Sequence, residues 1–235
     1  MHEIKISPAL LERAMERRGR IHPFESVEPA RTALIVVDMQ NGFVDPTLPI
    51  SVPVARDIVP NINRLAASCR QAGSPVVWLK HLADESAAAG WHNWFDTFAI
   101  AELRDALITH LSESAPGFEI WPELEVAAED QIVVKNRFSA FIQGSSDIDA
   151  VLRARDIDTL LITGTVTNVC CESTARDAAM LNYKVIMVAD ANAARSDDDH
   201  NAALNNLFNV FADVRTTDEV IAMLDASAPS LRRTA

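Results

Sequence analysis

Cysteines are few in this 235-residue sequence, and long apolar runs are absent. Of the three cysteines, Cys170 and Cys171 are neighbours, a spacing that provides neither a disulfide framework nor a set of zinc ligands. No apolar stretch approaches the roughly 20 residues that a membrane-spanning helix requires. These absences exclude a disulfide-rich secreted protein and a helical membrane protein.

Positive charge is also scarce, because 21 Lys and Arg residues stand against 33 Asp and Glu residues, for a formal net charge of −12. A surface of this sign repels nucleic acid and anionic membranes, so neither is expected as a partner. Residues 1–5 contain no apolar segment of the kind that a secretion signal needs. We therefore expect a cytoplasmic protein with reduced thiols.

What the sequence does contain is an alternation of runs rich in Val, Ile and Leu with segments of helical pattern. Such runs are typical of strands buried on both faces of a sheet, and the intervening helices indicate βαβ units. We expect a single α/β domain over residues 1–235, with three layers (αβα) and a six-stranded, mostly parallel sheet. The expected strands are residues 32–38, 75–79, 131–135, 159–163, 184–188 and 212–214.

Two segments lie outside this alternation. Residues 1–30 are expected to form a helical extension, with Ser7 as the N-cap of a helix and Pro8 as its first residue. Residues 82–130 hold three tryptophans and are expected to form an insertion near the functional site. No internal repeat, linker or low-complexity segment divides the chain.

Three reactive side chains follow expected strands. Asp38 closes the first strand, Lys135 closes the third, and Cys170 lies just past the fourth. Ligands of parallel α/β sheets bind beyond the carboxyl ends of the strands, so these residues can meet in one crevice. A carboxylate, an ammonium and a thiol are together suited to acyl transfer through a thioester. In that chemistry Asp38 takes the thiol proton and Lys135 stabilises the thiolate.

Cys170 is the candidate nucleophile because of where its segment begins. The fourth strand is expected to end at Gly164, and a helix to begin near residues 168–169 with the thiol in its first turn. The free N–H groups and the positive end of the helix dipole at such a position favour thiolate over thiol. The same N–H groups can hold the oxyanion of a tetrahedral intermediate.

Each of these residues has a structural alternative when it is taken singly. An aspartate at a strand end is often a turn former or a helix cap, and a lysine there can simply be solvated. Free cysteines are mostly inert core residues, which is the interpretation favoured for Cys69. The joint placement of Asp38, Lys135 and Cys170 is what favours a catalytic site.

Three blocks of the sequence closely resemble the isochorismatase-like cysteine hydrolases, in order and in spacing. The blocks are residues 34–43, 135–141 and 164–178. The resemblance implies a six-stranded parallel sheet flanked by helices and a catalytic triad of Asp38, Lys135 and Cys170. Within the family, the motifs are most similar to those of ureidoacrylate amidohydrolases and other amidases of carbamoyl compounds.

The resemblance also implies details around the nucleophile. A non-proline cis peptide bond is expected between Val166 and Thr167, where it directs the N–H groups of Thr167 and Cys170 at the oxyanion. Neighbouring side chains on a helix point about 100° apart, so only one of the two adjacent cysteines can face the crevice well. The motif register selects Cys170 and makes Cys171 a packing residue.

The substrate pocket is less clearly marked. Family members that bind a metal carry an Asp-x-His pair near the second strand, and the spacing of His81, Asp84 and His92 does not match it, so no metal or cofactor is expected. Tryptophans of an insertion can equally pack in a core or at a subunit interface. The candidate pocket walls are Asn41, Phe43, His81, Trp91, Trp94 and Phe141.

We therefore expect a metal-independent amidohydrolase in which Cys170 attacks a small amide, ureido or carbamoyl compound and releases ammonia or an amine. A lactamase with the same three residues is the enzymatic alternative. A catalytically silent binding module on the same fold is the alternative of another class. The expected partners are a small-molecule substrate and further copies of this chain, because relatives are commonly dimers or tetramers.

Overall fold

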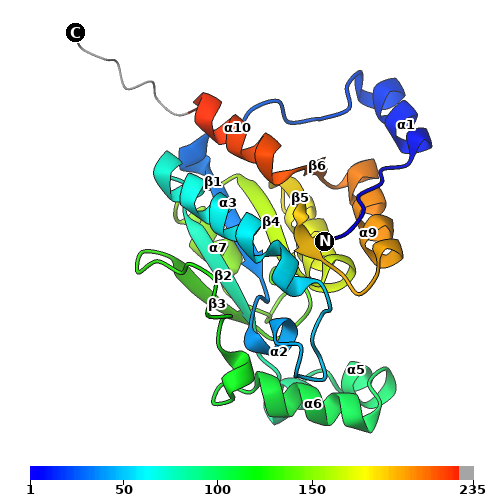
Figure 1. Ribbon diagram of the computed structural model, residues 1–235, viewed down its shortest axis with the longest axis vertical. Coiled ribbons are helices and arrows are strands. Elements are labelled where there is room, and N and C mark those ends of the chain that lie inside the picture. Colours follow the sequence, from blue (N-terminus) through cyan, green and yellow to red (C-terminus); the bar gives the residue numbers. More distant parts are fainter. Residues whose placement is uncertain (228–235) are drawn as a thin grey trace.

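Six parallel strands form one sheet, in the order β3-β2-β1-β4-β5-β6, in the computed structural model, which describes residues 1–227 (Figure 1). Residues 228–235 of the domain expected over 1–235 lie outside the described part. The strands are β1 (Thr32–Val37), β2 (Val76–His81), β3 (Gln131–Lys135), β4 (Thr159–Thr165), β5 (Lys184–Ala193) and β6 (Asp213–Arg215). The expected α/β fold and parallel six-stranded sheet are confirmed.

Helices cover both faces of this sheet and complete three layers (Figure 1). The helices on the faces are α3 (Val59–Ala72), α7 (Ile148–Arg153), α8 (Glu172–Met180), α9 (Asp197–Val210) and α10 (Thr217–Ser227). Apolar side chains of α3 and α10 share one core cluster with the sheet, and those of α7, α8 and α9 share the other. Each strand of the centre is therefore shielded from water on both sides.

Strand β1 shows how the sequence produces this arrangement. All six of its residues are buried, with Leu34 and Val36 in the core under α3 and Ile35 and Val37 in the opposite core. Successive side chains of a strand point to opposite faces, so a continuous apolar run suits a strand covered twice. Burying each such side chain contributes about 1.5–3 kcal/mol, which makes the centre of the sheet its most stable part.

The helix α3 buries a single apolar stripe. Ile62, Leu65, Ala66 and Cys69 are fully withdrawn from solvent and recur at the spacing of one helix face. The helix ends at Gly73, whose φ of 85° suits the left-handed cap position. Cys69 therefore lies in the core, where the sequence interpretation placed it.

The order of the strands creates a crevice at the carboxyl end of the sheet. The chain begins at the centre with β1, moves outward through β2 to β3, and then returns to β4 on the other side of β1. The connections after β1 and β4 therefore leave in opposite directions. A crevice between two such connections is where open α/β sheets bind ligands.

Strand β4 does not end at Gly164, as expected, but continues to Thr165. Gly164 has a φ of 107°, and a Cβ on it would lie 2.1 Å from the carbonyl oxygen of Val37. The glycine marks a close approach to β1 within the sheet, where the pairing of β4 with β5 shifts register after Ile162. Strand β5 is also longer than expected and reaches Ala193.

The amino-terminal extension contains α1 (Pro8–Arg18) and an arm that lies along α9. Ser7 occupies the N-cap position, as expected, but its side chain makes no cap hydrogen bond. Its backbone N–H donates instead to Asn205 Oδ1 at 2.7 Å, and the N–H of Lys5 donates to Asn201 Oδ1 at 2.6 Å. Two asparagines one turn apart on α9 thus fasten the arm.

The helices of the segment 82–130 lie beyond the carboxyl end of the sheet, next to α2 (Asn41–Val44) (Figure 1). These helices are α4 (Glu85–Ala89), α5 (His92–Thr97) and α6 (Ala101–Leu111). Phe95 and Leu111 are 2% and 0% exposed and anchor a small hydrophobic core, to which Phe43 and Ile50 also belong.

The later part of the segment joins a main core of the sheet, where Leu124 is buried and Ile120 and Trp121 pack against it. Residues 123–130 return along α3, where Arg70 pairs with Asp130.

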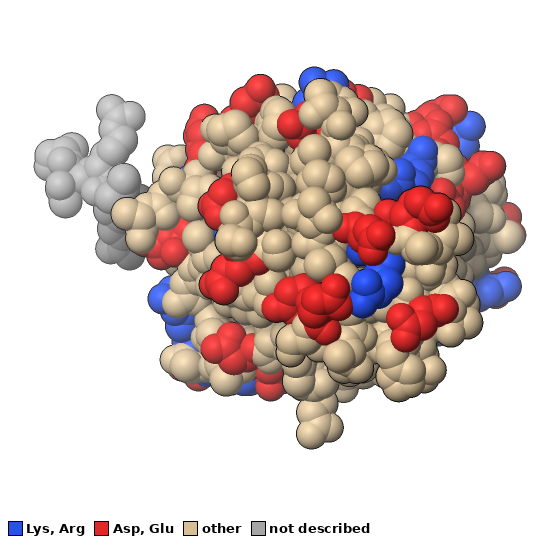
Figure 2. Space-filling model, turned by 90° about the horizontal axis from the view of Figure 1, so that it is seen from below, with Lys and Arg blue, Asp and Glu red and all other residues tan. Residues whose placement is uncertain are grey.

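Acidic side chains (red) are more widespread than basic ones (blue) on the face that Figure 2 shows, which agrees with the negative net charge. Among the helices within residues 1–227, none combines the length and the apolar character needed to cross a membrane.

Candidate active site

Asp38 follows β1 directly, at the centre of the crevice. Its side chain is 1% exposed, and its backbone adopts a φ of 50°, in the left-handed region that aspartate tolerates better than most residues. The backbone is held on both sides, because its N–H donates to the Leu79 carbonyl at 3.0 Å and its carbonyl accepts from Thr165 Oγ1 at 2.8 Å. The neighbouring strands thus fix where the carboxylate points.

Lys135 is the last residue of β3, and its ammonium reaches across β2 to Asp38. The Nζ atom lies 2.7 Å from Asp38 Oδ2, and the side chain is fully buried. The ammonium also lies 3.2 Å from His81 Nδ1 and donates to the Arg137 carbonyl at 3.2 Å. Each of its three N–H bonds therefore has a partner, as a buried ammonium requires.

Burial sets the protonation behaviour of this pair. It raises the pKa of the Asp38 carboxyl above its ordinary value, against the opposing attraction of Lys135. Burial is the largest influence on Lys135 and alone would lower its pKa, but the attraction of Asp38 and Cys170 and the hydrogen bonds to them together raise that pKa. The second carboxylate oxygen, Asp38 Oδ1, is buried and has no hydrogen-bond partner within residues 1–227. It is free to accept a proton.

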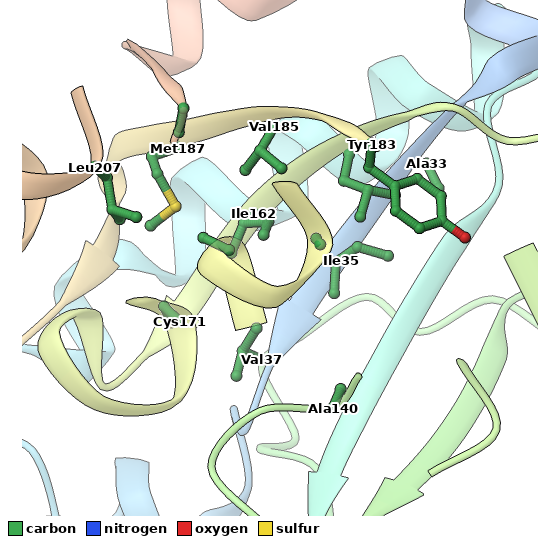
Figure 3. Packing of buried hydrophobic residues seen from close by; sticks show 14 of the residues in the cluster. Ala33, Ile35, Val37, Ala140, Ile162, Cys171, Tyr183, Val185, Met187 and Leu207 are labelled. Carbon is green, nitrogen blue, oxygen red and sulfur yellow. The ribbon is translucent and has the colours of Figure 1, made fainter. Parts of the chain in front are cut away.

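Cys170 lies in a single π-helical turn, Thr167–Cys171, that leads into α8. The residue is 5% exposed, and its thiol lies close enough to Asp38 and Lys135 for both charges to act on it. Cys171 is fully buried instead, with its sulfur 3.9 Å from the Thr163 carbonyl oxygen. Figure 3 shows Cys171 among core side chains of β1 and β4.

The structure reverses one expectation about the thiol. A position at the start of a helix was expected to favour the thiolate, but burial raises the pKa of the Cys170 thiol above its ordinary value, although the Lys135 ammonium opposes this. The sequence interpretation missed the closure of the site, which removes the water that would stabilise a thiolate. Cys170 is thus protonated in the resting protein and needs a base.

The cis peptide bond lies one residue earlier than expected, between Thr165 and Val166 rather than between Val166 and Thr167. The expected position came from the resemblance of the motif around the nucleophile, and it was one residue too late. Thr167 is fully buried, and its hydroxyl lies 2.9 Å from Nδ1 of His200 on α9. The N–H of Val166 has no hydrogen-bond acceptor in the described part of the chain.

His81 is the last residue of β2 and is neutral in this environment. Burial, followed by the positive charge of Lys135, lowers the pKa of its imidazole well below the ordinary value. Because the Lys135 ammonium can only donate, His81 Nδ1 must accept, and the ring proton resides on Nε2. His81 therefore offers a hydrogen-bond donor, not a base, to anything beside it.

A cavity of about 330 Å³ opens beside this group of residues. Five residues that the sequence interpretation singled out line it: Phe43, His81, Trp94, Val166 and Cys170. Thr167 does not line it, although it was expected to supply an oxyanion contact. The remaining lining residues were not anticipated: Ile50, Leu103, Leu107, Phe138, Val169 and Arg195.

Three of the expected pocket walls lie elsewhere. Asn41 binds the insertion instead, since its Nδ2 donates to the Pro116 carbonyl at 2.9 Å. Trp91 lines a neighbouring surface cavity and packs under the guanidinium of Arg137, 5.1 Å from the ring centre. Phe141 packs against Tyr183, with the ring centres 5.5 Å apart. None of the three lines the cavity beside Cys170, because sequence position does not reveal to which side each residue projects.

Arg195 is the most informative residue that sequence reasoning missed. Its guanidinium lines the cavity and donates to the carbonyls of Ser51 and Ile50, each at 3.1 Å. A signal was present, because Arg195 follows the carboxyl end of β5, where ligand-binding residues gather. It was overlooked because β5 was expected to end at residue 188.

The residues considered as metal ligands are used otherwise. The Asp84 carboxylate caps α4 by accepting from the Ala87 N–H at 2.7 Å, and His81 Nδ1 faces the Lys135 ammonium. Within residues 1–227 no group of three or more His, Cys, Asp or Glu side chains is placed to hold a metal ion.

The chain is similar to known proteins in both architecture and sequence. A model of the isochorismatase domain matches residues 32–219. Ureidoacrylate amidohydrolase RutB of Pseudomonas syringae pv. syringae (strain B728a) is 34% identical over 223 residues, covering 89% of each chain. A crystal structure of a cysteine hydrolase from Pseudomonas syringae pv. phaseolicola 1448A is similar with a TM-score of 0.76 and 35% identity, over 88% of this chain and 98% of that one.

A second solved structure, N-carbamoylsarcosine amidase from Thermoplasma acidophilum, is similar with a TM-score of 0.63 and 28% identity, over 80% of this chain and 97% of that one. The family model spans β1 to the start of α10 and thus includes the whole sheet. The chain belongs to the isochorismatase family of hydrolases.

Proposed function

We propose that the protein hydrolyses a small amide, ureido or carbamoyl compound, with Cys170 as nucleophile and Asp38 as proton carrier. The observation that carries this proposal is the meeting of a buried Asp38–Lys135 pair with the Cys170 thiol at the wall of a cavity. The relatives named ureidoacrylate amidohydrolase and N-carbamoylsarcosine amidase support the same class of substrate.

The first step follows from the protonated thiol. As the sulfur attacks the carbonyl carbon, its proton passes to Asp38, whose Oδ1 has no other partner. A carboxylate with a raised pKa is a stronger base than a solvated one, so burial suits Asp38 to this task. Lys135 keeps its positive charge throughout and balances the negative charge that moves between Asp38 and Cys170.

The carbonyl oxygen becomes an oxyanion when the sulfur–carbon bond forms. The backbone N–H groups of Val166 and Cys170, at the wall of the cavity, are the proposed donors to it. When the tetrahedral intermediate collapses, the carbon–nitrogen bond breaks and Asp38 returns the proton to the leaving nitrogen. Water then attacks the thioester, loses a proton to Asp38 and releases the acid, while the thiol is restored.

Arg195 indicates the rest of the substrate. Its guanidinium is held at the cavity by the Ser51 and Ile50 carbonyls, which leaves N–H groups for a ligand. Guanidinium groups bind carboxylates by charge-assisted hydrogen bonds. We therefore include in the proposal that the substrate carries a carboxylate in addition to its scissile carbonyl.

The experiment that tests the proposal combines ammonia release with trapping. Wild-type protein is incubated with simple amides, carbamoyl amino acids, ureido acids and lactams, and quenched samples are examined by peptide mass spectrometry. We expect ammonia or amine release and an acyl adduct on Cys170. Cys170→Ala should lose both signals, and the matched control Cys69→Ala should keep both. Turnover by Cys170→Ala would refute the mechanism.

The same panel separates the alternatives. Hydrolysis of a lactam opens the ring and retains the amine in the product, whereas hydrolysis of a linear ureide releases ammonia or an amine. A silent binding module would bind panel compounds without turnover.

The cytoplasmic location and the homo-oligomeric state expected from the sequence remain predictions. Light scattering of the purified protein tests the oligomeric state.

A further inference from the structure

The cavity beside Cys170 is mainly apolar. Of its eleven lining residues, only His81, Cys170 and Arg195 carry an ionisable group, and the other eight are aliphatic or aromatic. A pocket of this composition buries apolar parts of a ligand and orients it with a few polar contacts. In the proposed function the polar groups of the cavity already have partners on the substrate. The scissile carbonyl lies at Cys170, and the carboxylate binds Arg195.

The insertion supplies part of the apolar wall of the cavity. Leu103 and Leu107 of α6 and Trp94 of α5 face the cavity, and Leu103 is 36% exposed. Phe95 and Leu111 belong to the buried core of the insertion, and Leu103 does not. A large aliphatic side chain left open inside a cavity is explained by a ligand that covers it.

The size of the cavity sets the size of that ligand. An apolar cavity of about 150 Å³ holds a benzene molecule. The cavity here, about 330 Å³, therefore has room for a ring of that size together with a carbamoyl group and a carboxylate. A substrate without side-chain bulk would leave the apolar wall exposed to water.

We propose that the substrate carries a bulky apolar group, of about benzyl or isobutyl size, that packs against Leu103, Leu107 and Trp94. This inference rests on the proposed function for the position of the scissile group at Cys170. It assigns the substrate class to N-carbamoyl or ureido derivatives of apolar amino acids. Small or polar members of the same series are then poor substrates.

The test measures binding and turnover separately. Calorimetry with the Cys170→Ala protein compares N-carbamoylglycine with N-carbamoylleucine and with both enantiomers of N-carbamoylphenylalanine. One methylene in a hydrophobic pocket changes discrimination by about 10-fold or more, so at least one bulky compound should bind at least about 10-fold more tightly than the glycine compound. Wild-type kcat/KM values should follow the same order.

Leu103→Asn supplies the matched variant, because this half-open side chain can change without disturbing the buried core. We expect it to weaken binding of the preferred bulky compound by at least about 10-fold and to leave N-carbamoylglycine unchanged. The control is Ile100→Asn, which alters another large aliphatic residue of the insertion that is 69% exposed and does not line the cavity. Binding by this control should match the unaltered Cys170→Ala protein.

The outcomes separate this inference from the proposed function. Equal or tighter binding of the glycine compound overturns the inference, as does the absence of binding by all four compounds or an equal effect of the two asparagine variants. Hydrolysis of N-carbamoylglycine in preference to the bulky compounds also overturns it and leaves the amidase proposal intact. Selective binding of a bulky compound without turnover by the wild type supports the inference and refutes the amidase proposal.

Discussion

The ammonium of Lys135 lies 2.7 Å from Asp38 Oδ2, and both side chains are shut off from solvent. Charges taken out of water in this way are tolerated only as a pair, because each partner replaces the solvation that the other has lost. The ion pair is therefore a structural element of the crevice as well as part of the proposed chemistry.

Lys135→Met should destabilise the protein by about 3–5 kcal/mol, since it leaves a buried carboxylate without a partner. Urea unfolding followed by circular dichroism measures this change. The double variant Lys135→Met/Asp38→Asn removes both charges and should recover more than half of the loss. A single variant as stable as the wild type would show that Asp38 is protonated or hydrated at rest.

The two adjacent cysteines should behave differently. Cys170→Ala should reduce kcat/KM by at least about 10³-fold, whereas Cys171→Ala should keep turnover near the wild-type level and cost roughly 1 kcal/mol of stability. Steady-state kinetics and urea unfolding check the two halves of this prediction. Loss of turnover in a folded Cys171→Ala protein would contradict the choice of Cys170 over Cys171 as the nucleophile.

Stability should fall at alkaline pH because buried thiols resist ionisation. Burial raises the pKa of Cys69 to about 12, while an unfolded thiol has a pKa of about 8.5. The contribution is thus fully present below about pH 8.5 and is lost as pH rises toward 12. Raising the pH from 7.5 to 9.5 should therefore lower the free energy of unfolding by about 1.4 kcal/mol for one such thiol.

Urea unfolding at the two pH values, under reducing conditions, measures this loss. Cys69→Ala should lose about 1.4 kcal/mol less than the wild type over the same interval. Burial raises the pKa of Cys170 and of Cys171 as well, so the variant should still be less stable at pH 9.5. An identical loss in both proteins would contradict the assignment to Cys69.

Arg195→Met should affect binding rather than chemistry. A hydrogen bond to a charged group contributes about 1.5–3 kcal/mol, so KM for a carboxylate-bearing substrate should rise about 10- to 100-fold while kcat changes little. A substrate whose carboxylate is replaced by an amide should show no such rise. Arg64→Met, which alters an exposed arginine paired with Asp218, serves as the control.

Gly164→Ala should prevent folding or destabilise the protein by more than about 3 kcal/mol, because the new Cβ meets the Val37 carbonyl oxygen and φ is positive. Gly73→Ala is the matched control, since Gly73 also has a positive φ but nothing lies within 4 Å of the added atom. It should cost only about 1–2 kcal/mol. Similar effects of the two changes, measured by thermal unfolding, would show that crowding at Gly164 is unimportant.

Much of the fold, and the meeting of Asp38, Lys135 and Cys170 at one edge of the sheet, could be predicted because they depend on local patterns. Apolar runs buried on both faces located the strands, and the carboxyl ends of those strands located Asp38 and Lys135. The boundaries of β4 and β5 were less predictable. The pairing of β4 with β5 continues beyond the apolar runs through Gly164 and Asn192, and glycine and asparagine are both uncommon in strands.

The cavity walls could not be predicted because they depend on tertiary packing. Leu103 and Leu107 share a helical face with residues of the insertion core, and nothing in the local pattern says which of them remains open. The raised pKa of the Cys170 thiol also depends on burial by distant segments, whereas the sequence indicated only the start of a helix. The environment of a side chain cannot be predicted from local patterns when it is set by residues far away in the sequence.

The ion pair of the crevice joins residues 97 positions apart in the sequence, and the thiol follows a strand on the far side of β1. Such distant contacts form late, after the loops between them have closed. Asp38, Lys135 and Cys170 therefore come together only when β1 to β4 have docked in order. Recovery of activity during refolding should consequently trail the recovery of helical signal, so that activity reports the completed sheet and not the mere presence of secondary structure.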